Sequence, residues 1–192
     1  MAAGVAYPLR FDVDYPERLS RWLIFVKWLL AVPHLLIVYA LSLVASVITF
    51  IAFFAILFTG RYPEELFKFV VGVYRWSANV SAYVGLLRDD YPPFSWEPGR
   101  YPVTFEVDYP ERLSRWKIFV KWLLVIPNLV VFMFLVIVYC IVFIIAWFAI
   151  LFTARYPRSL FDFSVGFHRW SLRMSAYASY LLTDKYPPFS LK

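Results

Sequence analysis

The residues best suited to chemistry are two histidines, His34 and His168, because histidine transfers protons near neutral pH and binds metals. Neither lies at ligand spacing from a cluster of His, Asp or Glu side chains. Cys140 is the only cysteine, which excludes a disulfide or a cysteine-based metal site within the chain. No serine lies in a G-x-S-x-G pattern, and there is no glycine-rich phosphate loop. We therefore expect a protein that is not an enzyme and uses no cofactor or metal.

Two arginines are more informative, because they interrupt long apolar stretches. Arg75 and Arg169 lie at equivalent places, and Asp162 lies two turns from Arg169 on the same helical face. An ionisable group at membrane depth is costly to bury and is by default a functional hypothesis. Two interpretations stay open. The arginines point inward, toward Asp162 or backbone carbonyls, or they meet lipid headgroups at the surface.

Basic residues flank the apolar blocks, and the net charge is +6. That distribution suits anionic lipid headgroups better than nucleic acid. We expect lipid or partner contacts from eight residues: Arg21, Lys27, Arg61, Arg75, Arg115, Lys121, Arg155 and Arg169.

The elements that must position these residues come from a tandem duplication. The eight residues YPERLSRW occur at 15–22 and again at 109–116, and each copy precedes a similar apolar run. Later in each copy come an R-Y-P and an R-W-S tripeptide. We divide the chain into a first membrane repeat (1–95), a linker (96–100) and a second membrane repeat (101–192).

This pattern resembles a family of bacterial membrane proteins catalogued only as a domain of unknown function, recurrent in actinobacteria and Chloroflexi. The resemblance covers nearly the whole chain, once per repeat, and rests on the YPERLSRW, R-Y-P and R-W-S elements. It implies a membrane location and no particular activity.

Each repeat opens with an alternating segment. Apolar and polar residues alternate over 8–14, which is the period of a half-buried strand, and the second copy repeats the pattern. A single strand is not stable alone. We therefore expect the two copies to pair with each other, Leu9–Val13 against Val103–Val107.

Helices should follow. Residues 17–31 have the pattern of an amphipathic helix at the membrane interface, and Pro33 should end it. Residues 34–58 and 128–152 are apolar and long enough to span a bilayer with some tilt.

Residues 64–87 and 158–182 carry a narrow charged stripe on an apolar helix, so they either span or lie in the interface. If the strands pair, each repeat must cross an even number of times, which two spans per repeat satisfy. A hairpin that dips in and out is the alternative. The excess of Lys and Arg on the strand side predicts that both termini are cytoplasmic.

The composition agrees with this fold class. Hydrophobic residues make up 62% of the 192 residues, well above an ordinary soluble domain. We expect an all-α integral membrane protein of the bacterial inner membrane, multi-pass, with two pseudo-symmetric repeats, interfacial amphipathic helices and a small two-stranded surface sheet. Its expected function is that of a non-catalytic structural or accessory subunit, which associates with membrane lipids and with other membrane subunits or further copies of itself. The alternatives are a small transporter or channel lined by Arg75 and Arg169, and a membrane-shaping protein.

Overall fold

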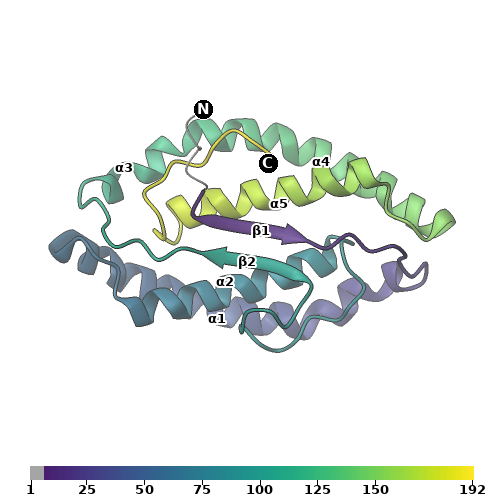
Figure 1. Ribbon diagram of the computed structural model, residues 1–192, viewed down its shortest axis with the longest axis horizontal. Helices are drawn as coiled ribbons and strands as arrows, with labels where there is room; N and C mark the ends of the chain where they lie inside the picture. Colours follow the sequence, from purple (N-terminus) through teal and green to yellow (C-terminus); the bar gives the residue numbers. More distant parts are fainter. Residues whose placement is uncertain (1–6) are drawn as a thin grey trace.

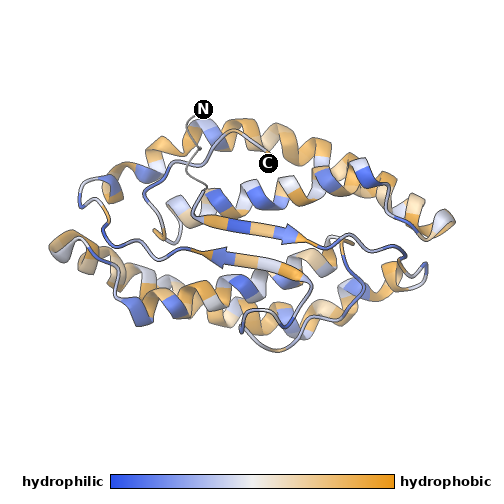
Figure 2. Ribbon diagram, in the orientation of Figure 1, coloured by the Kyte–Doolittle hydropathy of each residue, from blue (hydrophilic) through white to orange (hydrophobic). Residues whose placement is uncertain are grey.

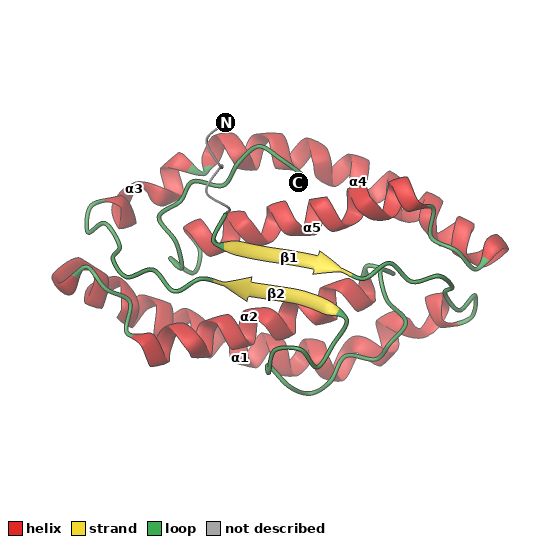
Figure 3. Cartoon of the chain, in the orientation of Figure 1, coloured by secondary structure: helices red, strands yellow, loops and turns green. Residues whose placement is uncertain are grey.

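The computed structural model describes residues 7–192. The same kinds of element follow one another twice (Figures 1 and 3). The first half contains β1 (Leu9–Val13), α1 (Leu23–Thr59) and α2 (Glu64–Val84). The second half contains β2 (Val103–Val107), α3 (Lys117–Leu124), α4 (Ile126–Thr153) and α5 (Arg158–Ala178).

The two strands pair as the sequence predicts. β1 and β2 form an antiparallel two-stranded sheet in which Leu9 lies opposite Val107 and Phe11 opposite Phe105. One face of the sheet is buried, and the other exposes its polar residues. On the exposed face Arg10 pairs with Glu106 at 3.1 Å and with Asp108 at 2.9 Å. The sheet therefore joins the repeats and has one polar, water-compatible face.

The helices lie behind and beside this sheet. Figure 1 shows α1 and α4 along the two long sides of a lens-shaped outline, with the sheet midway along its length. On α2, Arg75 binds the strand residue Phe105, whereas Val84 lines a groove between α1 and α4. Nine positions separate these two residues, about two and a half helical turns, so they lie on opposite faces of α2. α2 thus lies between the sheet and the groove.

The two halves are related by a pseudo-two-fold axis. Phe25 of α1 contacts Trp147 of α4 edge to face, with ring centres 5.0 Å apart. The same contact recurs with the repeats exchanged, between Phe53 and Phe119, at 5.4 Å. Phe119 lies on α3, so the long helix of each repeat touches the first helical turns of the other repeat, and the halves share one apolar core.

The expected separate interfacial helix at 17–31 is wrong in the first repeat. α1 begins at Leu23, where Ser20 Oγ accepts the backbone N–H, and continues through Pro33 to Thr59. Proline removes one backbone donor and disturbs the preceding turn. Close to it the Tyr91 hydroxyl donates to the Leu30 carbonyl at 3.0 Å, which gives that carbonyl a partner. In the second repeat the helix does divide, at Val125, just before Pro127.

The YPERLSRW segments are not helical because the other repeat holds their backbone. Leu19 N–H donates to the Ala154 carbonyl, and Leu113 N–H donates to the Gly60 carbonyl, each at 2.9 Å. Gly60 and Ala154 are the residues that end α1 and α4, and both adopt positive φ. Each segment is therefore fixed to the end of the other repeat's long helix.

The long helices expose most of their apolar side chains. The buried residues of α1 form one narrow stripe, and the rest of its surface is open and mainly hydrophobic. In Figure 2 the ribbons of α1 and α4 are largely orange, the colour of hydrophobic residues. Within residues 7–192, two helical stretches are long and apolar enough to cross a membrane, Leu23–Thr59 and Lys117–Thr153. α2 and α5 are helices as predicted but are not among them.

Candidate functional site

Arg75 is held by the strand of the other repeat. Its Nε donates to the Phe105 carbonyl at 3.0 Å and its Nη1 to the Trp96 carbonyl at 2.8 Å. Burial lowers the pKa of Arg75, but a guanidinium remains charged at any physiological pH. Its partners are therefore backbone carbonyls of the protein, as one of the two interpretations expects.

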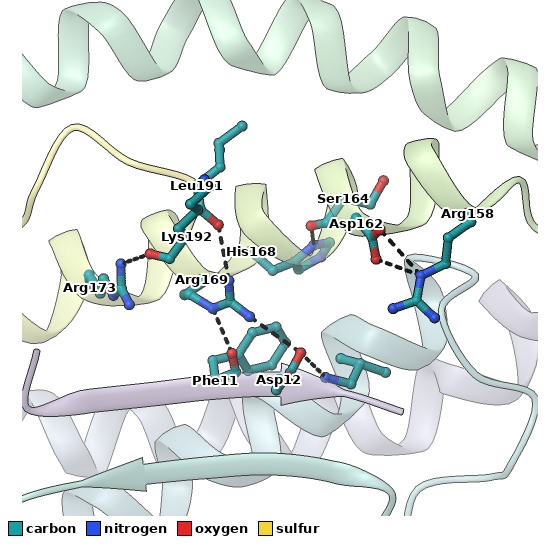
Figure 4. A network of polar contacts seen from close by, with 11 residues as sticks. Phe11, Asp12, Arg158, Asp162, Ser164, His168, Arg169, Arg173, Leu191 and Lys192 are labelled. Carbon is teal, nitrogen blue, oxygen red and sulfur yellow. Dashed lines mark hydrogen bonds and ion pairs between the residues drawn. The ribbon is translucent and has the colours of Figure 1, made fainter. Parts of the chain in front are cut away.

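Arg169 makes the equivalent contacts in the second repeat. Figure 4 shows its guanidinium between the strand β1 and the C-terminal segment. It donates to the carbonyls of Phe11 at 2.7 Å and Leu191 at 3.0 Å, and to Asp12 Oδ1 at 3.3 Å. Asp162, a partner expected from the sequence, instead pairs with Arg158 at 3.0 Å. The two arginines therefore fasten each amphipathic helix to the strand of the opposite repeat.

Lys27 and Lys121 do not reach lipid headgroups, contrary to expectation. The side chain of Lys27 is 2% exposed, and its Nζ lies 2.8 Å from Asp89 Oδ1 and 2.6 Å from the Arg88 carbonyl. Lys121 makes the same pair of contacts, with Asp184 at 2.8 Å and the Thr183 carbonyl at 2.7 Å. Both lysines belong to the buried stripe of their helix. Their ammonium groups therefore point into the protein rather than toward the membrane surface.

The remaining four predicted residues gather in two pockets at the ends of the molecule. Each pocket combines the YPERLSRW segment of one repeat with the end of the other repeat's long helix. One pocket, of about 580 Å³, is lined by Arg18, Leu19, Arg21, Trp22, Thr153, Ala154 and Arg155. The other, of about 420 Å³, is lined by Thr59, Gly60, Arg61, Arg112, Leu113 and Arg115. We call these the two arginine pockets.

Arg18 and Arg112 complete the arginine pockets and were missed as candidates. The signal for them is in the motif itself, where two arginines stand three positions apart and next to the conspicuous tryptophan. The third arginine of each pocket comes from the distant R-Y-P element. No local pattern brings it there, since the contact depends on the exchange between repeats.

A larger apolar groove of about 610 Å³ lies between α1 and α4. Its lining includes Val38 of α1, Val84 of α2, Phe143 of α4 and His168 of α5. The imidazole Nδ1 of His168 lies 2.8 Å from the Ser164 carbonyl, so this nitrogen carries a proton and donates. Burial lowers the pKa of His168. A neutral imidazole among apolar side chains has no neighbouring carboxylate here to act with it.

Metal-ligating side chains are not grouped in the part of the chain that the structure describes. No set of three or more His, Cys, Asp or Glu residues within 7–192 is arranged to hold a metal ion. Cys140 is a free, exposed thiol on the wall of the apolar groove.

Comparison with known proteins returns a family and no characterised relative. No curated protein and no solved structure matches the chain. One family model, Domain of unknown function (DUF4389), matches it twice in tandem, over residues 21–95 and 115–190. The two matches begin at Arg21 and Arg115, equivalent positions of the two repeats. The chain therefore belongs to this family of unknown function and carries two consecutive copies of its domain.

Proposed function

We propose that this protein is a non-catalytic membrane component that lies flat in one leaflet, with its sheet facing water. One observation carries the proposal. The charged face of the sheet lies midway along the molecule, beside apolar helices that run along the same axis (Figures 1 and 2). If the long axis stood across the membrane, the sheet would lie at the same depth as the middle of the helices. If the long axis lies in the membrane plane, the sheet and the helices can lie at different depths.

An upright orientation is energetically unfavourable. α1 has 37 residues and is ~55 Å long, against a hydrocarbon core of ~30 Å. With α1 upright, the middle of the molecule would lie within the hydrocarbon. Arg10 and Glu106 on the exposed sheet face would then be in lipid, at a cost of several kcal/mol per charge. The flat orientation places these charges in water and the outer surfaces of α1 and α4 in lipid.

The flat orientation differs from the multi-pass arrangement that the sequence predicts. The parity argument required only that both strands lie on one side, and a protein that never crosses satisfies it equally. The excess of Lys and Arg on the strand side then favours the cytoplasmic leaflet of the bacterial inner membrane, with both termini in the cytoplasm. Anionic lipid is the expected partner there.

A structural or accessory role fits the exposed surface best. A large apolar area along α1 and α4 can bury lipid tails or other membrane subunits, further copies of this chain included. Insertion into a single leaflet also favours the membrane-shaping alternative, because such helices act as a wedge. Arg75 and Arg169 are occupied as clamps, so the transport alternative loses the residues on which it depended.

Cysteine accessibility tests the orientation. The native thiol, Cys140, is replaced by Ala, and single cysteines are then introduced at Asp12, Glu64 and Gly99 for labelling with a membrane-impermeant maleimide. In the flat orientation all three label from the cytoplasmic side, in inverted vesicles and not in intact spheroplasts. In the parent protein, which keeps Cys140, this thiol should stay protected from the maleimide until detergent is added. Labelling of positions 64 and 99 from opposite sides would establish the spanning arrangement instead.

A further inference from the structure

The six arginines of the arginine pockets have no partners within residues 7–192. None of their guanidinium groups makes a hydrogen bond, ion pair or ring contact there, whereas the arginines elsewhere in the described chain do. Glu17 and Glu111 stand beside them in sequence but line neither pocket. Three unpaired cations thus face each pocket, and the arrangement occurs twice.

Helix capping does not account for these charges. Basic side chains at a helix C-terminus commonly bind its last carbonyls and offset the helix dipole. Here none of the six guanidinium groups bonds a carbonyl at the end of α1 or α4, and part of that role falls to backbone groups. Gly60 N–H donates to the Ile56 carbonyl, and the Gly60 carbonyl accepts from Leu113. The end of α4 is closed in the same way by Ala154.

The chemistry of three guanidinium groups points to phosphate. Each guanidinium is planar and offers paired donors that match phosphate oxygens, and its charge persists at all relevant pH values. A threonine also lines each pocket, Thr153 in one and Thr59 in the other. A phosphate bound there would replace the mutual repulsion of the arginines with charge-assisted hydrogen bonds.

The surroundings of each pocket indicate that this phosphate is attached to a lipid. Trp22 lines one pocket and Trp116 directly follows Arg115 of the other in sequence, and the two tryptophans are 80% and 81% exposed. Phe152 and Phe58, next in sequence to the pocket threonines, are each 72% exposed. Exposed tryptophan beside basic residues is typical of the boundary between headgroups and acyl chains. A free anion needs no such apolar border.

We propose that each arginine pocket binds the phosphate of one anionic phospholipid, so that one chain holds two such lipids at opposite ends. Each site takes two arginines from one repeat and one from the other, so that it exists only when the repeats are docked. The inference rests on the proposed location in a leaflet and adds to it the place, chemistry and number of the lipids.

Lipid counting in charge-matched variants tests the proposal. Purified full-length protein in neutral detergent is titrated with phosphatidylglycerol, and bound lipids are counted by native mass spectrometry. The first variant is Arg18→Gln/Arg21→Gln/Arg155→Gln, and the second is Arg61→Gln/Arg112→Gln/Arg115→Gln. The control, Lys68→Gln/Arg100→Gln/Arg158→Gln, removes the same charge from exposed residues outside the pockets.

The expected counts are two lipids for the parent and the control, and one for each triple variant. Each arginine removed should weaken binding at its own site roughly 5-fold, which corresponds to about 1 kcal/mol per charge at a membrane surface. Losing all three should weaken it roughly 100-fold. Two tightly bound lipids on a variant that combines both triple changes would overturn the proposal. So would equal losses in the control, since the effect would then be net charge alone.

Two further measurements separate the sources of phosphate and the two proposals. Inorganic phosphate added at millimolar concentration should displace little phosphatidylglycerol. If inorganic phosphate displaced the lipid when both were present at the same concentration, the pockets would instead be sites for a free anion. Flotation with vesicles of pure phosphatidylcholine reports membrane association without the arginine pockets. Variants that float normally but lose bound phosphatidylglycerol support both proposals. A parent that fails to float removes the proposed location, while the phosphate titration still reports on the pockets.

Discussion

Trp76 donates its indole N–H to Nδ1 of His34, at 3.1 Å in the buried interior. The second repeat makes the same bond with a different acceptor, because Trp170 donates to Oδ1 of Asn128 at 2.9 Å. A ring nitrogen and an amide oxygen thus accept the same hydrogen bond at equivalent places of the two repeats. The sequence alone shows only that the two residues differ.

We therefore expect His34→Asn to be tolerated and His34→Leu to be destabilising. Leucine leaves the buried N–H of Trp76 without an acceptor, at a cost of about 1–3 kcal/mol in the free energy of unfolding. Thermal unfolding in detergent, followed by near-UV circular dichroism, measures the difference. Equal melting of the two variants would show that the hydrogen bond contributes nothing.

Replacing Arg75 or Arg169 by leucine should destabilise the protein. Each change leaves carbonyls of the opposite repeat without their donors, which costs roughly 1–3 kcal/mol per buried group. Lys68→Leu is the matched control, since Lys68 lies on the same helix as Arg75 and pairs only with exposed carboxylates. Melting at the parental temperature for both arginine variants would argue against the clamp.

The buried pair Lys27–Asp89 should show strong coupling. Lys27→Met removes the cation beside a partly buried carboxylate, and breaking such a pair costs about 3 kcal/mol or more. Adding Asp89→Asn should recover part of this loss, because no unpaired charge then remains. A double-mutant cycle on chemical unfolding measures the coupling, and strictly additive effects would contradict it.

Acid should weaken the fold partly through His168. Its pKa is lowered by burial, so the unfolded chain takes up a proton first as the pH falls below about 6.5. The stability that depends on neutral His168 is therefore complete above that pH and is lost on acidification. The variant His168→Gln does not titrate and should lose less stability between pH 7 and pH 5. An identical loss in parent and variant would assign the acid response to other groups.

The sequence predicts the regular parts of this fold for simple reasons. The alternation of apolar and polar residues over 8–14 is typical of a half-buried strand. Its recurrence in the second copy supplies the only obvious partner strand in the sequence. The apolar runs likewise predict long helices. Pro33 misleads because a proline can also lie inside a long helix, where it disturbs one turn without ending the helix, and α1 continues through it to Thr59.

The candidate site is harder to predict, because its residues come from different repeats. Composition marks Arg21 and Arg155 equally as surface charges, and nothing local places them in one pocket. Lys27 looks like a headgroup contact from its neighbours Val26 and Trp28. The Lys27 side chain is in fact buried, and its partner Asp89 lies too far along the chain for the local sequence to indicate this.

The exchange of hydrogen bonds between repeats bears on how such a chain arose. Leu19 depends on Ala154, Leu113 on Gly60, and each strand on the other, so neither half satisfies its own backbone. A protein with a single copy of this domain would have to pair with a second copy about the same two-fold axis. In this respect the tandem chain corresponds to a dimer whose two copies are joined covalently between the repeats. Once fused, its halves were free to diverge, and His34 opposite Asn128 records one such divergence.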